Sequence, residues 1–160
     1  MKISVKQLAR GAIIGALYTV TTLLLVPISF GAIQFRVSEV LTVLPFIMPE
    51  AVLGLTIGCF VSNIIGSSLI DAVFGTLATF LAALVTSKIK KMFLAPLPAV
   101  IFNAVIVGGA ITVMSVEFTL NNYLIIALSV GISEFIICYA GGIPFLVFIH
   151  KLSQKINFLK

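Results

Sequence analysis

Long apolar runs alternate with short polar or charged stretches along the whole of this 160-residue chain. A helix needs about 20 mostly apolar residues to cross the roughly 30 Å hydrocarbon core of a bilayer. The apolar runs place six predicted spans at about residues 8–28, 37–48, 51–65, 71–87, 95–116 and 123–149. The pattern therefore predicts a single all-α integral membrane domain over residues 1–160, a bundle of six transmembrane helices.

The second predicted span is the shortest of the six. A helix of about 12 residues covers about 18 Å at 1.5 Å per residue, which is less than the thickness of the core. The outer end of this span, with Arg36 and Glu39, is therefore expected below the membrane surface, where irregular backbone must be buried in protein or line a cavity. The connection before it, residues 29–36, alternates apolar with smaller or polar residues and is expected to be extended.

Composition supports the membrane interpretation. Hydrophobic residues make up 61% of the chain and charged residues only 9%, against about 45–50% and 25% in soluble domains. A water-soluble fold of this size would not cover its surface with so few charges. The first apolar run is too long for a cleavable signal peptide and is interpreted as the first span.

The placement of basic residues predicts the topology. All ten Lys and Arg residues except Arg36 lie at the N-terminus, in the loop at residues 88–91 or in the C-terminal tail. Positive charge concentrates on the cytoplasmic side of membrane proteins, so both termini are expected in the cytoplasm. This arrangement requires an even number of spans in the cell membrane. It also accounts for the net charge of +5 without nucleic acid as a partner.

Small residues form a motif in the first span, where Ala12 and Ala16 are flanked by Gly11 and Gly15. Residues four apart share a helix face, and small side chains there allow another helix to approach closely. Two interpretations stay open. The motif packs against the protein's own helices, or it forms a docking face for another membrane subunit.

Three acidic residues, Glu39, Asp71 and Glu134, lie in or at the ends of predicted spans. A carboxylate in hydrocarbon is costly, so such residues normally face the interior of a bundle with a partner. Glu39 has Arg36 one turn earlier as an alternative ion-pair partner, and Asp71 has an alternative role as the N-cap of the fourth span. Glu134 has no basic neighbour in sequence, which favours a ligand contact or a proton site.

Two amides, Asn63 and Asn103, add hydrogen-bonding groups at membrane depth, where the alternatives are bonds between helices and contacts to a ligand. With the acids and Arg36, they predict a polar pocket that opens to the outside. A carboxylate-rich pocket favours a cation or a ligand rich in donors. A guanine-like edge, with a ring N–H beside an amine, donates two parallel hydrogen bonds to one carboxylate.

Motifs for soluble catalysis are missing from the sequence. It has no Gly-rich Walker loop, and its single histidine, His150, lies in the predicted cytoplasmic tail. Ser-His chemistry and HExxH zinc chemistry are thereby excluded. We expect no enzyme activity, no metal and no cofactor in this chain, so any ATP hydrolysis would take place in partner subunits.

Three segments resemble the signature of the queuosine-precursor transporter (QueT) family. They are residues 33–46 (IQFRVSEVLTVLPF), residues 71–79 (DAVFGTLAT), and residues 131–134 (GISE) followed by residues 142–144 (GIP). Ser133 stands where a glycine is expected. With the opening Ala/Gly helix, the resemblance covers essentially the whole chain. This family belongs to the substrate-binding components, or S-components, of energy-coupling factor (ECF) transporters.

The resemblance implies a six-helix membrane subunit with a membrane coupling subunit and two cytoplasmic ATPases as partners. In such proteins the small-residue motif of the first helix, here Ala12 and Ala16, meets the coupling subunit. Substrate binds near the outer face, and the loop after the first helix helps to cover it. The implied substrate is a 7-deazaguanine queuosine precursor. Glu39 and Glu134 are its expected main contacts, and the secondary contacts are Arg36, Asn63, Asp71 and Asn103.

Two other functions remain open from the sequence. The chain could be a stand-alone secondary transporter that uses Glu134 as a proton-coupling group. Its small size and the lack of a visible repeat count against this, because many such carriers have duplicated halves. A structural membrane protein without a small ligand is the third hypothesis, and it requires every buried acid to be paired internally.

Overall fold

The computed structural model describes residues 4–30, 34–115 and 118–156. In chain order the helices are α1 (Val5–Leu24), α2 (Val26–Ser29), η1 (Val37–Phe46), α3 (Ala51–Gly66), α4 (Leu69–Thr86), η2 (Met92–Leu94), α5 (Leu97–Phe102), η3 (Asn103–Val107), α6 (Gly108–Met114), α7 (Leu120–Ile136), η4 (Ile137–Gly142) and α8 (Ile143–Ile156). The elements η1 and η2 are 3₁₀ helices, whereas η3 and η4 are π-helical turns inside longer helices.

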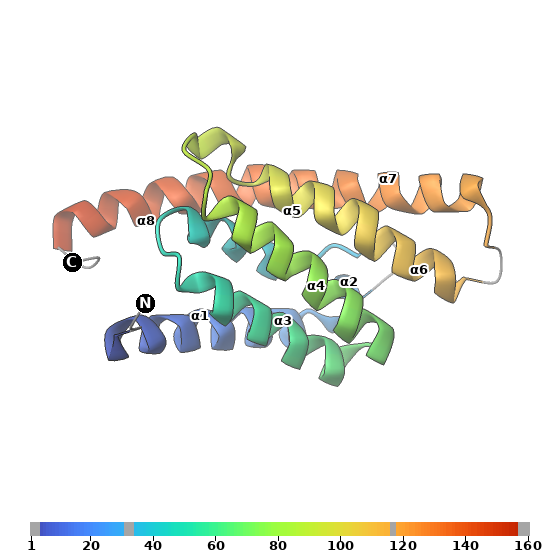
Figure 1. Ribbon diagram of the computed structural model, residues 1–160, viewed down its shortest axis with the longest axis horizontal. Coiled ribbons are helices and arrows are strands. Elements are labelled where there is room, and N and C mark those ends of the chain that lie inside the picture. The colour runs from blue at the N-terminus through green and yellow to red at the C-terminus, as the bar shows by residue number, and fades with distance from the viewer. Residues whose placement is uncertain (1–3, 31–33, 116–117, 157–160) are drawn as a thin grey trace.

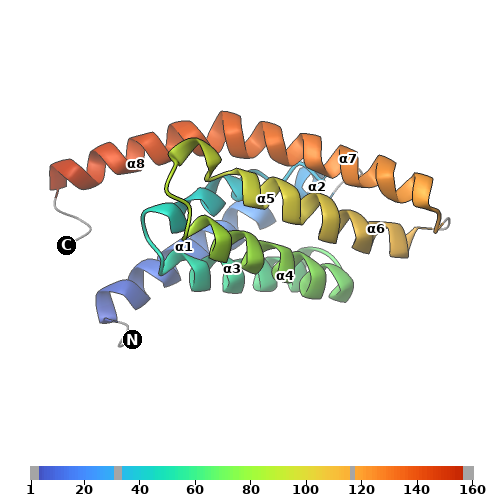
Figure 2. The same ribbon diagram turned by 45° about the horizontal axis from the view of Figure 1, so that its top comes forward.

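The helices form an elongated bundle and run roughly along its long axis (Figure 1). The elements α7, η4 and α8 form one continuous helix along the length of the bundle, and α5, η3 and α6 form a second one beside it (Figures 1 and 2). The beginning of α1 and the end of α8 lie at the same end of the bundle in both views.

Four helical stretches are long and apolar enough to cross a membrane, namely Val5–Leu24, Leu69–Thr86, Met92–Met114 and Leu120–Ser153. The protein is therefore a multi-pass membrane protein, and the part of the chain that the structure describes is helical without strands. Two further apolar helices, Val37–Phe46 and Ala51–Gly66, are shorter than a full span. The count of six spans and the cytoplasmic position of both termini stay predictions.

The second predicted span is a 3₁₀ helix and not an α-helix. With about 2.0 Å rise per residue, ten residues cover about 20 Å, so the segment is still shorter than the hydrocarbon core. Residues three apart stack in a 3₁₀ helix, and this brings Glu39, Thr42 and Pro45 onto one buried row. Pro45 has no N–H to donate and favours an early end to regular α-helical bonding.

The connection before η1 is expected to be extended, and residues 31–33 of it lie outside the described part of the chain. Gln34 has a φ of 48°, which is uncommon for a residue other than glycine. Arg36 is extended, with φ −95° and ψ 96°. The chain enters the bundle at Arg36, which is buried.

The helices α1 and α3 pack closely through glycines. A methyl group on Gly54 would lie 2.9 Å from the carbonyl carbon of Gly11, and one on Gly15 would lie 2.7 Å from the carbonyl oxygen of Gly54. Only glycine permits such an approach of two backbones. The glycines of the small-residue motif thus pack against the protein's own helix, which was one of the two sequence interpretations.

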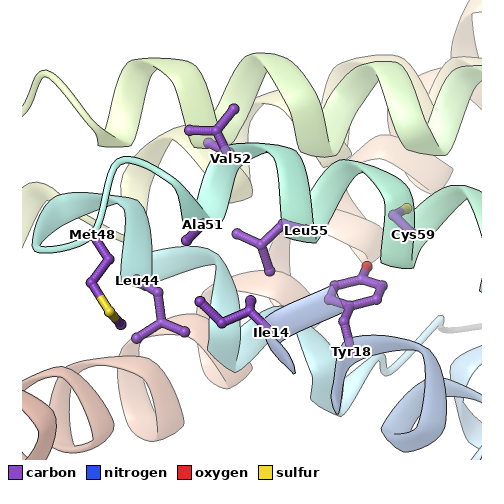
Figure 3. Packing of buried hydrophobic residues seen from close by; sticks show 9 residues of the cluster. Ile14, Tyr18, Leu44, Met48, Ala51, Val52, Leu55 and Cys59 are labelled. Carbon is purple, nitrogen blue, oxygen red and sulfur yellow. The ribbon is translucent and has the colours of Figure 1, made fainter. Parts of the chain in front are cut away.

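Apolar side chains fill the space next to this crossing. Ile14 and Tyr18 of α1 meet Leu44 of η1, Ala51 and Leu55 of α3, and their neighbours in one cluster. Figure 3 shows the Tyr18 ring at one end of the cluster, with its hydroxyl directed toward Cys59 on α3. The apolar cluster ends at this hydroxyl, and a polar region begins there.

Candidate ligand-binding site

All six sequence-predicted site residues are buried. The exposed fraction is 0% for Glu39 and Asn63, 3% for Asn103 and 4% for Glu134. Arg36 and Asp71 are 5% and 6% exposed. The residues come from η1 and the segment before it, α3, α4, η3 and α7. Helices far apart in the sequence therefore direct the side chains of Arg36, Glu39, Asn63, Asn103 and Glu134 into one closed interior, which we call the polar core, whereas the Asp71 side chain bonds to Ser67 at its edge.

Glu39 lies at the centre of the polar core. Its Oε1 atom accepts a hydrogen bond from the hydroxyl of Tyr18 on α1. Its backbone carbonyl accepts one from the Thr42 hydroxyl at 2.6 Å, which follows from the stacking of residues three apart in η1. Its Oε2 atom is buried and has no hydrogen-bond partner in the part of the chain that the structure describes.

Arg36 lies near Glu39, Tyr18 and Cys59. Its guanidinium carbon lies 4.9 Å from the centre of the Phe30 ring, in a cation–π arrangement. Its Nη1 atom is 3.8 Å from Cys59 Sγ. The direct ion pair with Glu39 that the sequence offered as an alternative is not formed between these two described residues, and the Tyr18 hydroxyl donates to the Glu39 carboxylate.

Glu134 is the second carboxylate of the polar core and interacts electrostatically with both Glu39 and Arg36. The thiol of Cys138 contacts both acidic residues. Its Sγ atom lies 3.4 Å from the Glu134 carboxylate oxygen Oε2 and 3.6 Å from the backbone carbonyl oxygen of Glu39. Asn103 lies near both carboxylates, yet its Nδ2 atom is buried without a hydrogen-bond partner among the described residues.

Both helices that supply these groups carry a π-helical turn at the polar core. Asn103 is the first residue of η3, and Cys138 is the second residue of η4, directly after the helix that carries Glu134. A π-turn inserts an extra residue into an α-helix and is frequent at functional sites. Here each turn rotates the residues that follow it about the helix axis, at the point where the helix passes Glu39.

Asn63 connects the polar core to the start of α4. Its Nδ2 atom donates to the backbone carbonyl of Asp71 at 2.9 Å and lies 3.3 Å from Cys59 Sγ. The Asp71 carboxylate accepts a hydrogen bond from the Ser67 hydroxyl. Asp71 is not the N-cap of this helix, because Ser68 occupies that position and its hydroxyl accepts the Asp71 backbone N–H at 3.1 Å.

Four buried side-chain atoms of the described residues have no hydrogen-bond partner: Glu39 Oε2, Asn63 Oδ1, Asn103 Nδ2 and Thr76 Oγ1. A buried polar atom left unpaired costs about 1–3 kcal/mol, and such atoms are rare in folded proteins. Three of the four belong to residues that the sequence singled out for ligand binding. A bound ligand that supplied donors to Glu39 and Asn63 and an acceptor to Asn103 would remove this cost.

Among the residues that the structure describes, no group of three or more His, Cys, Asp or Glu side chains is arranged to hold a metal ion. Cys59 and Cys138 are both free thiols. Cys59 Sγ lies near several donors, with the Thr79 hydroxyl at 3.3 Å in addition to Arg36 and Asn63.

A groove of about 760 Å³ lies on the outside of the α1–α3 pair, away from the polar core. Ala12 and Ala16 line it and are exposed, whereas the adjacent Gly11 and Gly15 face α3. The Arg10–Glu50 ion pair, at 3.2 Å, joins α1 to the residue before α3, and Glu50 lines one end of the groove. The small-residue motif thus serves two faces, since its glycines pack against α3 at the floor of the groove and its alanines are exposed along it. We call this surface the α1–α3 groove.

Comparison with known proteins places the chain among transporters. The family model described as "QueT transporter" matches residues 8–151, which is most of the chain.

The chain belongs to the QueT transporter family.

A curated relative, the queuosine precursor transporter QueT of Lactococcus lactis subsp. cremoris (strain MG1363), is 41% identical over 70 residues. The match covers 42% of this chain and 41% of the relative's length. No solved structure matches the chain. The resemblance found in the three sequence motifs is confirmed, and membership of a transporter family indicates a transport role and not an enzymatic one.

Several polar groups at the core of this QueT-family protein escaped the sequence analysis, and Tyr18 is the most important of them. Its signal was present in the first span, where Gly11, Gly15, Tyr18 and Thr22 follow one another in steps of four, three and four residues. These four residues are buried together on one face of α1. A polar aromatic on the face that also carries the packing glycines indicates a hydrogen bond inside the bundle.

Proposed function

We propose that this chain is the substrate-binding S-component of an ECF-type importer and that it binds a 7-deazaguanine queuosine precursor in the polar core. A membrane coupling subunit and two cytoplasmic ATPases would complete the transporter and supply the energy of ATP hydrolysis. Membership of the QueT transporter family and the name of the Lactococcus relative support this proposal.

The unpaired atoms of the polar core carry the ligand assignment. Glu39 Oε2 and Asn63 Oδ1 require donors, and Asn103 Nδ2 requires an acceptor. A deazaguanine edge offers a ring N–H and an amine as adjacent donors, with a carbonyl oxygen beside them. In this arrangement the carboxylate of Glu39 receives a charge-assisted hydrogen bond, which is about twice as strong as a neutral one.

The charges of the polar core fit the aminomethyl form of such a precursor. Glu39 and Glu134 are two carboxylates that lie near one guanidinium, that of Arg36, in this interior. A ligand with one positive charge would balance the second carboxylate. Glu134 is proposed to meet that cation, while Arg36, Asn63, Asp71 and Asn103 are secondary contacts.

The outward direction of the pocket and the docking face are also proposals. The six site residues are closed from solvent in this structure, so a ligand would enter by movement of the segment before η1, which carries Arg36. Six spans with both termini in the cytoplasm would place that segment on the outer side. The α1–α3 groove, through Ala12 and Ala16, would then receive an apolar surface of the coupling subunit.

Ligand binding to the purified chain tests the proposal. We expect 7-aminomethyl-7-deazaguanine to raise the apparent melting temperature in detergent, since a ligand at 100 times its Kd stabilises the folded state by about 2.7 kcal/mol. Guanine and an unrelated vitamin are the control ligands. A shift with a control ligand and none with any queuosine precursor would refute the substrate assignment.

Isolation of the native complex tests the assembly. Affinity purification of the tagged chain from native membranes should recover one membrane partner and two ATPases. A stand-alone proton-coupled transporter is the competing function, and the proximity of Glu39 and Glu134 favours it, because two interacting carboxylates can share a proton. Uptake by proteoliposomes that contain this chain alone, if abolished by an uncoupler, would establish that function and contradict ours.

A further inference from the structure

Tyr18 reaches the polar core from α1, a helix for which the sequence predicts only packing or docking. Its side chain is fully buried, and its hydroxyl donates to Oε1 of Glu39. It also lies close enough to Arg36 to interact with the guanidinium. The hydroxyl is therefore next to both the carboxylate and the guanidinium.

The position of the Tyr18 ring is fixed by its surroundings. A methyl group on Gly58 of α3 would lie 3.1 Å from Tyr18 Cβ. The adjacent Thr19 hydroxyl donates to the Gly58 carbonyl at 3.1 Å, and Thr22, one turn later, shares a hydrogen bond with Ser38 at 2.6 Å. Helix α1 is thus held against both α3 and η1, so the phenol has little freedom to follow a moving carboxylate.

The bond from Tyr18 decides which oxygen of Glu39 is available. With Oε1 taken up, Oε2 is left as the buried atom without a partner among the described residues. Without the phenol, the nearest strong attraction for this carboxylate is the guanidinium of Arg36. A direct Arg36–Glu39 pair would then form and use the acceptor that a ligand needs.

We propose that Tyr18 is a positioning residue of the ligand site, which holds Glu39 away from Arg36 so that Oε2 meets the amine of a bound deazaguanine. This inference rests on the proposed function. In this role Tyr18 does not contact the ligand, and it affects ligand specificity only through the position of Glu39. The role depends on the hydroxyl and not on the ring, so Tyr18→Phe removes it and keeps the packing.

Two ligands separate this role from a purely structural one. The probes are 7-aminomethyl-7-deazaguanine and the same compound without its 2-amino group, each titrated against the full-length chain. We expect the native protein to favour the first probe by at least about tenfold, since the site presents an acceptor for that amine. Tyr18→Phe should lower the affinity for the first probe about tenfold and leave the affinity for the second nearly unchanged, so that the preference disappears.

The matched control is Thr22→Val, which removes the other side-chain hydrogen bond between α1 and η1 and should retain the preference. A second variant, Glu39→Asp, keeps the charge but shortens the side chain by one methylene, so the carboxylate no longer reaches the phenol. It should lose the preference as Tyr18→Phe does, and it tests the inference even where Tyr18→Phe does not fold.

Each result decides between the two roles. The positioning role would be overturned if Tyr18→Phe lowered the affinity for both probes equally, or if Thr22→Val lost the preference to the same extent. Tyr18 would then only hold α1 against its neighbours. A preference that survives in Glu39→Asp would also overturn it. Failure of the native chain to bind the first probe would instead overturn the proposed function, and this inference with it.

Discussion

Substitution of Gly54 by alanine tests the close approach of α1 and α3 on which the polar core and the α1–α3 groove both depend. The added methyl group would lie 2.9 Å from the carbonyl carbon of Gly11 and 3.1 Å from its Cα, and closer still to its oxygen. These neighbours are backbone atoms, so no side chain can turn away and the two helices must separate. Overpacking of this kind costs about 1–3 kcal/mol.

The effect is measurable as a shift in melting temperature. A change of 1 kcal/mol moves the melting temperature of a chain of this size by about 2–4 °C, so Gly54→Ala should lower it by about 2–12 °C in detergent. Gly109→Ala is the matched control, because its methyl group would first meet Tyr123 Cε2 at an ordinary 3.7 Å. Both changes add the same helix-forming residue, so their difference isolates the contact.

The result also bears on the ligand. Separation of α1 from α3 displaces Tyr18, whose Cβ lies beside Gly58 in the same crossing. Gly54→Ala should therefore weaken binding of 7-aminomethyl-7-deazaguanine in addition to lowering stability. A melting temperature equal to that of Gly109→Ala would refute the glycine contact and the coupling argued from it.

Three further predictions follow from the site and the groove. Glu134→Gln should weaken the aminomethyl probe about tenfold to a hundredfold in isothermal titration, because a hydrogen bond to a charged group contributes about 1.5–3 kcal/mol; an unchanged affinity would remove Glu134 from the site. Replacement of Ala12 and Ala16 by leucine should fill the groove and abolish co-purification of partner subunits, while ligand binding persists. The control Ile13→Phe, on the exposed surface of the same helix, should leave both co-purification and ligand binding unchanged. The Cys59 thiol is fully buried among donors of the polar core, so bound ligand should slow its reaction with a small permeant maleimide, measured by mass spectrometry; equal rates with and without ligand would place the ligand elsewhere.

The helical class and the burial of the acids could be predicted from sequence because both follow from simple periodicity. Asp71 and Glu134 stand on helix faces of small residues, and such faces approach neighbouring helices. The glycines of the Ala/Gly motif pack against α3, as one of its two interpretations expected, whereas docking of another subunit on the alanines stays a prediction. In a helix, Gly11 and Ala12 point about 100° apart, so one motif faces both α3 and the groove.

Other features depend on tertiary contacts and could not be derived from local pattern. A segment of only ten residues, with Ser38, Glu39 and Thr42 among apolar side chains, cannot distinguish three residues per turn from 3.6, so the 3₁₀ form of η1 was not predicted. Arg36 and Glu39 are near neighbours in sequence, and this proximity suggested a direct pair, whereas Glu39 accepts its hydrogen bond from Tyr18, 21 residues away. The π-helical turns at Asn103 and Cys138 leave no trace in hydrophobic periodicity.

The most direct test of the central claim is equilibrium binding of 7-aminomethyl-7-deazaguanine to the purified chain, measured by isothermal titration for the native protein and for Glu39→Gln. Our account predicts saturable binding with one ligand per chain in the native protein and at least about tenfold weaker binding in the variant, because the charge-assisted hydrogen bond at Oε2 is lost. Absence of saturable binding in the native protein, or equal affinity in the two proteins, would contradict it.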